Sequence, residues 1–185
     1  MRKEFSVAAA TNLIDAAAAD CWQSRQCITC HTNFSYLLVR PGLKKPSPVA
    51  IDVRQQLEDL VEKTVGKKGP RWDAEVAMSG AILAQHDAAT TGKLHPTTRK
   101  ALNHMWTVQR ADGPFNWLKC DWPPMKSDDH YGATIALIGA GSASAATAQA
   151  VAGILRLKEY LAANPPPHPI TSSWCCGLRR TIRGS

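Results

Sequence analysis

Apolar residues recur at helical spacing along most of the chain. Between residues 49 and 65, the positions Val53, Leu57, Leu60, Val61 and Val65 follow the i, i+4, i+7, i+8 spacing of one helix face. No segment alternates apolar and polar residues as a half-buried strand would. The pattern therefore predicts an all-α fold, with further helices over 12–21, 34–39, 74–89, 97–109, 131–139 and 145–161.

Proline and glycine mark where these helices end. The breaks are Arg40-Pro41-Gly42, Gly66 to Pro70, Gly92 to Pro96 and Ala111 to Pro114. Asp73 is expected to cap the helix that follows it. Asp128 and Asp129 stand at the start of another helix, where carboxylates meet the positive end of the helix dipole. Short turns between helices favour antiparallel hairpins, and residues 1–168 are predicted to form a single domain.

Composition and charge narrow the choice of partners. A chain of 185 residues is long enough for one domain with a real core. The formal net charge is +7, and Arg179, Arg180 and Arg183 in the last segment contribute to it. Such a balance can help docking to an acidic redox partner protein, and an ordinary solvated surface with an excess of lysine is the simpler explanation of the charge. The basic–aromatic stripe expected of nucleic-acid binding is missing from the sequence, and its apolar runs are too short for a membrane span.

The segment Cys27-Ile28-Thr29-Cys30-His31 is a CxxCH sequence, and it stands directly before a predicted helix. This pattern is typical of covalent haem attachment. The two thiols form thioethers with the two vinyl groups of haem, and the adjacent imidazole binds the iron. The sequence therefore predicts haem c, with its iron, as the cofactor. Cys27 and Cys30 are its expected anchors, and His31 is the expected proximal ligand.

Two other kinds of site use the same cysteine spacing. A thioredoxin-type redox pair would precede a helix within a βαβ pattern, which this sequence does not show. A structural zinc site needs further ligands at close spacing, and no second CxxC or HxxxH follows the motif. The haem interpretation is therefore preferred over both.

The sequence identifies the sixth ligand of the iron less clearly than it identifies His31. Met125 lies in the loop Trp122-Pro123-Pro124-Met125, a conformation that can bring a thioether to iron. We take Met125 as the predicted second metal ligand. A vacant or water-bound position would instead make a site that binds small ligands. Methionines within helices usually pack in the core. The remaining candidates are Met78, Met105, His86, His104 and His130.

Three segments resemble a known family. Residues 106–117, WTVQRADGPFNW, are similar to the QW repeat of the terpenoid cyclase superfamily. Residues 128–133 resemble the acidic stretch that begins an inner helix in that fold. With the CxxCHT sequence and the YLLVRP segment over 36–41, the chain resembles bacterial squalene–hopene-cyclase-like proteins that carry a CxxCH near the N-terminus. The resemblance spans about 10–168. It implies a partial α/α toroid, in which the Gln and aromatic residues tie a helix end to the next turn.

Cyclase chemistry is not expected to accompany this resemblance. Squalene–hopene cyclases protonate an alkene with the middle Asp of a DxDD motif, whereas here Lys126 replaces the first acid and Ser127, Asp128 and Asp129 follow. A neighbouring cation favours ionised carboxylates and opposes retention of that proton. We expect no enzymatic activity, and the alternative function is binding of an apolar ligand by a toroid fragment. The tryptophans that could line a cavity, or simply pack, are Trp72, Trp106, Trp117 and Trp122.

The two ends of the chain bear on where the haem would be attached. After Pro167 the helical pattern collapses, and one hypothesis is that the irregular tail 169–185 is a frame-shifted end. The stretch from Ser6 to Ala19 contains Asn12 and Asp15, so it does not form the apolar core of a signal peptide. Haem c is attached outside the cytoplasm. The expected location is therefore the periplasm if haem is attached, with a signal peptide supplied by an upstream start.

Overall fold

The computed structural model describes residues 6–25, 32–43, 45–118, 128–143 and 147–166. Within these ranges the chain forms seven α-helices, one short 3-10 helix and no β-strand, which confirms the all-α prediction. In chain order the elements are α1 (Val7–Arg25), α2 (Asn33–Val39), η1 (Arg40–Leu43), α3 (Pro48–Thr64), α4 (Pro70–Thr90), α5 (Pro96–Thr107), α6 (Asp129–Gly141) and α7 (Ala148–Ala163).

Three helices begin at a proline that the sequence pattern assigned to the preceding turn. Pro48, Pro70 and Pro96 each occupy the first turn of their helix. Proline fits there because its missing N–H has no partner within the helix and its φ angle is already helical. The expectation that Asp73 caps α4 is therefore wrong. Gly69 holds the cap position, and Asp73 is buried inside the first turn, where it accepts a hydrogen bond from Asn116 Nδ2 at 2.7 Å.

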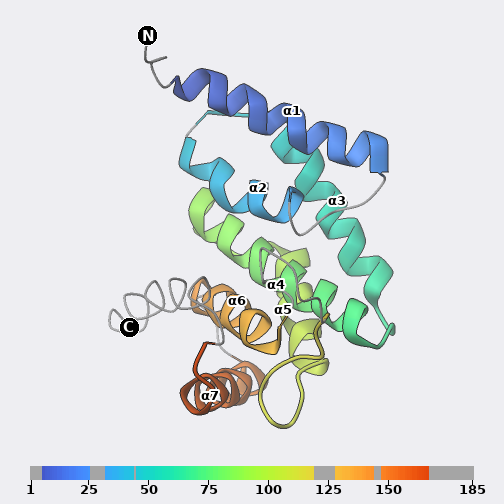
Figure 1. Ribbon diagram of the computed structural model, residues 1–185, viewed down its shortest axis with the longest axis vertical. Coiled ribbons are helices and arrows are strands. Elements are labelled where there is room, and N and C mark those ends of the chain that lie inside the picture. Colours follow the sequence, from blue (N-terminus) through green and yellow to red (C-terminus); the bar gives the residue numbers. More distant parts are fainter. Residues whose placement is uncertain (1–5, 26–31, 44, 119–127, 144–146, 167–185) are drawn as a thin grey trace.

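Helix α4 is the centre of the fold. It contacts α2, η1, α3, α5 and α6. Figure 1 shows α2 between α1 and α4, with α6 and α7 toward the other end of the molecule. Every residue of α4 from Val76 to Ala84 is buried. A helix that is apolar around its whole circumference is stable only when other helices surround it.

Small residues let the neighbouring helices approach α4 closely. A Cβ atom added to Gly139 of α6 would lie 2.3 Å from Ala81 Cα of α4. A Cβ atom at Gly80 would lie 3.2 Å from the carbonyl oxygen of Ala101 in α5. The first of these distances is shorter than van der Waals contact, so α6 reaches its observed position only because residue 139 has no side chain.

We expect the substitution Gly139→Ala to lower the free energy of unfolding by about 2 kcal/mol, because the new methyl group forces α6 away from α4. Gly42 is the control, since a Cβ atom there meets nothing within 4 Å. Gly42→Ala is expected to be neutral or slightly stabilising. Urea unfolding of both variants measures the difference, and equal stability of the two would contradict the close packing of α4 and α6.

Candidate functional site

The predicted haem anchors Cys27 and Cys30, the predicted ligand His31 and the predicted second ligand Met125 lie outside the described residues. The structure does describe the helices on either side of the CxxCH sequence. Helix α1 ends at Arg25, and α2 begins at Asn33, two residues after His31. The CxxCH sequence therefore lies between α1 and α2 in the chain. The helix that was predicted directly after the motif is present as α2.

A partly buried ion pair between Asp15 of α1 and Arg40 of η1, together with Tyr36 of α2, joins these three elements. Arg40 Nε donates to Asp15 Oδ1 at 2.7 Å, and Tyr36 donates its hydroxyl proton to the same oxygen at 2.7 Å. Arg40 Nη1 also donates to the carbonyl oxygen of Lys45. The hydrogen bond from Arg40 holds the pKa of Asp15 below its ordinary value, and burial raises the pKa of Tyr36. The charged forms of Asp15 and Arg40 are therefore stabilised, and they fix α1, α2 and η1 as one frame.

Asn33, the first residue of α2, is completely buried. Within the described part of the chain, neither its Nδ2 nor its Oδ1 atom has a hydrogen-bond partner. Phe34 and Leu37 of the same helix are buried as well. A buried amide without hydrogen bonds lowers the stability of the fold by about 1–3 kcal/mol. Asn33 therefore destabilises the fold at this position unless a further group forms hydrogen bonds with its side chain.

The two helical methionines considered as iron ligands are core residues. Met105 is fully buried in α5, and Met78 is buried on α4. Both belong to the main hydrophobic cluster. This burial confirms the expectation that helical methionines in this chain pack in the core.

The three histidines considered as ligands lie on different helices. His86, on α4, is half-buried, and its Nδ1 atom lies 2.8 Å from Arg54 Nη1. Burial is the main cause that lowers its pKa to about 4. His104, on α5, is half-buried and His130, on α6, is buried; burial lowers the pKa of each. Across the described ranges no three His, Cys, Asp or Glu side chains converge on a point that could hold a metal ion.

The turn after α5 is organised by Gln109. Its Nε2 atom donates to the carbonyl oxygen of Gly113 at 2.7 Å and to that of Gly153, in α7, at 3.0 Å. Its Oε1 atom accepts from Arg156 Nη2 at 2.7 Å. Gly113 has φ +112°, a backbone conformation that favours glycine. Gln109 therefore ties the end of α5 to the following turn and to α7.

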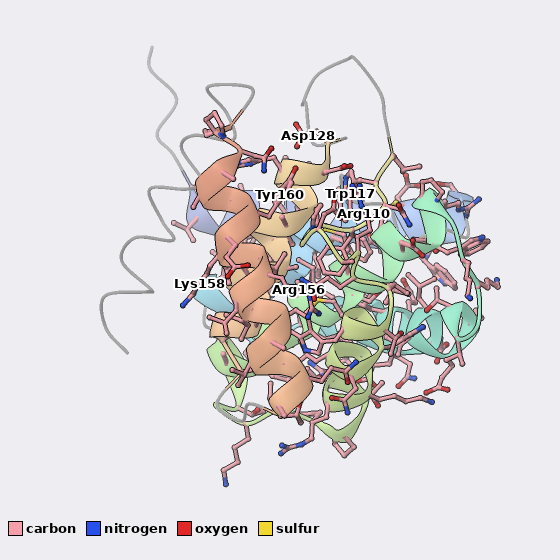
Figure 2. The ribbon with its side chains drawn as sticks, turned by 90° about the horizontal axis from the view of Figure 1, so that it is seen from below. Arg110, Trp117, Asp128, Arg156, Lys158 and Tyr160 are labelled. Carbon is pink, nitrogen blue, oxygen red and sulfur yellow. The ribbon has the colours of Figure 1, made fainter. Side chains whose placement is uncertain are left out.

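Asp128 and Asp129 act at the beginning of α6. Asp128 accepts a hydrogen bond from the backbone N–H of Tyr131 at 2.6 Å, which confirms its predicted capping role. Asp129 pairs with Arg110 at 2.9 Å. Figure 2 shows Arg110, Asp128 and Tyr160 at the same end of the molecule, and burial raises the pKa of the Tyr160 hydroxyl. Asp128 thus serves the start of α6, and Asp129 serves an ion pair with Arg110.

Tryptophans of this region pack on glycines. A Cβ atom at Gly132 would lie 2.4 Å from Trp117, and one at Gly153 would lie 2.3 Å from Trp106. Trp72 instead lies partly exposed at the start of α4, with Lys67 Nζ 4.0 Å from its ring centroid. Trp122 lies outside the described residues. The indoles of Trp106 and Trp117 therefore fill the space that the glycines leave between α5, α6 and α7.

A second buried ion pair, which sequence reasoning missed, joins α3 to α4. Arg54 Nη1 lies 2.6 Å from Asp87 Oδ1, and the carboxylate of Asp87 is fully buried. Arg54 also donates to Glu58, and Asp87 Oδ2 accepts from the backbone N–H of His95 at 2.8 Å. The sequence signal for this site was a carboxylate near the end of a predicted helix, and such a signal does not identify the partner.

No helix within the described ranges is long and apolar enough to cross a membrane. Comparison with protein-family models, with curated proteins and with solved structures finds no match. The functional argument therefore depends on the residues of this chain.

We expect Gln109→Leu to lower the free energy of unfolding by about 2 kcal/mol, because the Gly113 and Gly153 carbonyls and Arg156 lose their partner together. Gln55 is the control, since its side chain donates to Asp59 on the exposed face of α3. Gln55→Leu is expected to change stability by less than about 0.5 kcal/mol. Thermal and urea unfolding of both variants test this, and similar losses in the two would contradict the role of Gln109.

The lowered pKa of His86, which lies beside Arg54, should make the stability of the fold depend on pH. The folded pKa of His86 is about 4, below the 6.5 of a free histidine. The fold thus favours the neutral ring, so its stabilising effect is full above pH 6.5 and is lost as pH falls from 6.5 through about 4.

His86→Gln keeps an acceptor for Arg54 and does not titrate. We expect the loss of stability between pH 7 and pH 4.5 to be smaller in this variant, by about 1 kcal/mol after allowing for the solvent contact that His86 retains. Urea unfolding at the two pH values measures it. An identical loss in the variant and the unchanged protein would contradict the assignment.

Proposed function

We propose that this protein is a c-type haem protein that serves electron transfer or haem-linked sensing. Cys27 and Cys30 are the thioether anchors, and His31 is the proximal iron ligand. The observation that carries the proposal is the CxxCH sequence, whose two thiols and imidazole occur in the order that covalent haem attachment requires.

The residues beside the motif fit such a group. Phe34 and Leu37 of α2 belong to the main hydrophobic cluster, so the CxxCH sequence is followed directly by an apolar part of the fold, as attachment of a porphyrin ring would require. Asn33, next to them, offers one acceptor and two donors that have no partner among the described residues. Haem carries both an apolar ring and polar propionate groups, so it would account for a buried carboxamide in an apolar setting.

The chain's own residues would hold the group and limit its motion. The Asp15–Arg40 ion pair and the hydrogen bond from Tyr36 to Asp15 keep α1, α2 and η1 together beside the CxxCH sequence. When bound, haem supplies a one-electron redox change at its iron, tuned by the axial ligands and by burial. Met125 remains the proposed second ligand. Met78 and Met105 are packed in the core and His86 is hydrogen-bonded to Arg54, whereas His104 and His130 stay as alternatives.

The proposal also covers the partner and the location. A net charge of +7 favours an acidic redox partner, whose attraction would weaken as salt is added. Attachment of haem c takes place outside the cytoplasm, so the periplasm is the proposed location.

A second candidate function is a non-catalytic α/α toroid fragment that binds an apolar ligand. The observation that favours it is the Gln109 turn, which ties α5 to α7 in the way that the resemblance to the QW repeat implies. Antiparallel hairpins arranged around α4 are compatible with part of such a toroid. The two candidates are compatible with each other, since one concerns the scaffold and the other the CxxCH sequence.

The haem proposal is tested by expressing the chain behind an export signal in a host that has a haem c maturation system. The unchanged protein is expected to give a pyridine haemochrome spectrum of haem c after denaturation. The double variant Cys27→Ala/Cys30→Ala is expected to carry no covalent haem. Cys21→Ala, which removes a buried cysteine of α1 outside the motif, is the matched control and is expected to keep it.

Two outcomes would contradict the proposal. One is an unchanged protein that is folded and exported but has no covalent haem and a full count of free thiols. The other is covalent haem that persists in the double variant.

A further inference from the structure

A small apolar cavity lies between α5, the C-terminal end of α6 and the N-terminal half of α7. Its volume is about 130 Å³. Figure 2 shows α7 running alongside α5. The apolar residues that line the cavity include Leu94, Leu102, Trp106, Ala140, Ala150 and Ile154.

The cavity follows from how α7 is held. Gly153 lies against the indole of Trp106, so α7 meets α5 closely at that point. One turn earlier along α7, the wall is formed by Ala150, and the facing end of α6 offers Ala140 and Ala143. Alanine side chains are too short to fill the space beside a tryptophan. An unfilled space therefore remains beside the indole of Trp106, whose position is set by its packing on Gly153.

Arg99 lines this cavity, and it differs from the other arginines whose side chains the structure describes. Arg40, Arg54, Arg71, Arg110 and Arg156 each have a carboxylate or amide partner. No such partner of the Arg99 guanidinium exists within the ranges that the structure describes, although the residue lines the cavity and is exposed. An apolar void with an unpaired guanidinium beside it favours a ligand with an apolar body and one anionic group.

We propose that this cavity binds a small carboxylate with a single ring or a short branched chain. Arg99 binds the carboxylate, since its guanidinium can donate two parallel hydrogen bonds to it. Trp106, Leu102 and Ile154 pack on the apolar body. The volume limits the enclosed apolar body to about one small ring, since a cavity of about 150 Å³ holds benzene, and the carboxylate lies outside it at the exposed side chain of Arg99. Haem, a sterol or a long acyl chain is too large, so this site is independent of the proposed haem function.

Benzoate is the probe for the test, and it is compared with benzyl alcohol, which has the ring without the charge. Binding to the full chain is measured by calorimetry and by the shift of the Trp106 indole N–H signal in NMR spectra. We expect Arg99→Gln to weaken benzoate binding about tenfold, the loss of one charge-assisted interaction, and to leave binding of benzyl alcohol unchanged. Ala150→Leu fills the void and is expected to abolish binding of both compounds.

Lys100→Gln is the control, because it removes the same charge one residue along α5 at a side chain paired with Glu62. It is expected to leave both affinities unchanged, and unfolding curves establish that every variant is folded. Absence of a saturable Trp106 shift with benzoate would overturn the proposal. An equal loss of benzoate binding in Arg99→Gln and Lys100→Gln would also overturn it, since only general charge would then matter.

Discussion

The fold depends on the burial of α4 by closely approaching small residues. From Val76 to Ala84 this helix has no exposed residue, and it contacts four other α-helices and the 3-10 helix η1. Gly139 allows α6 to rest on Ala81, and Gly80 allows the backbone of α5 to come near. The positions of α2 and α6 relative to each other are therefore set through α4. Because α2 follows the CxxCH sequence and packs on α4, the surroundings of the motif depend on this packing.

Three polar clusters then fix how the surrounding helices pair. Asp15 and Arg40, 25 residues apart, join α1 to α2 and η1. Arg54 and Asp87 join α3 to α4, and Gln109 joins the end of α5 to α7. Apolar packing is not directional, whereas an ion pair or a carboxamide with three hydrogen bonds demands one geometry. These clusters therefore give the hairpins a specific arrangement, which is what a site made from separate helices requires.

Much of the fold could be predicted from local sequence, because helical spacing, proline and glycine act within a few residues. The helices, the capping role of Asp128 and the burial of Met78 and Met105 follow from such local rules. Asp73 was misassigned because an acid near a helix start suits both a cap and a first turn. The partners of Asp15, Asp87 and Gly139 lie far along the chain, and no local pattern identifies them. The same is true of the cavity at Arg99, which exists only once α5 and α7 are packed.

The proposed haem site combines the CxxCH sequence with the helices on either side of it. The sequence supplies the anchors and the ligand of the proposed haem. The structure supplies the frame of α1, α2 and η1 and the buried amide of Asn33, which has no hydrogen-bond partner among the described residues. The most direct measurement is the intact mass of the exported chain under denaturing conditions, after expression with a haem c maturation system. The account predicts that the mass exceeds that of the polypeptide by one haem and that reduction of disulfides does not remove the difference. A mass equal to that of the bare polypeptide would contradict it.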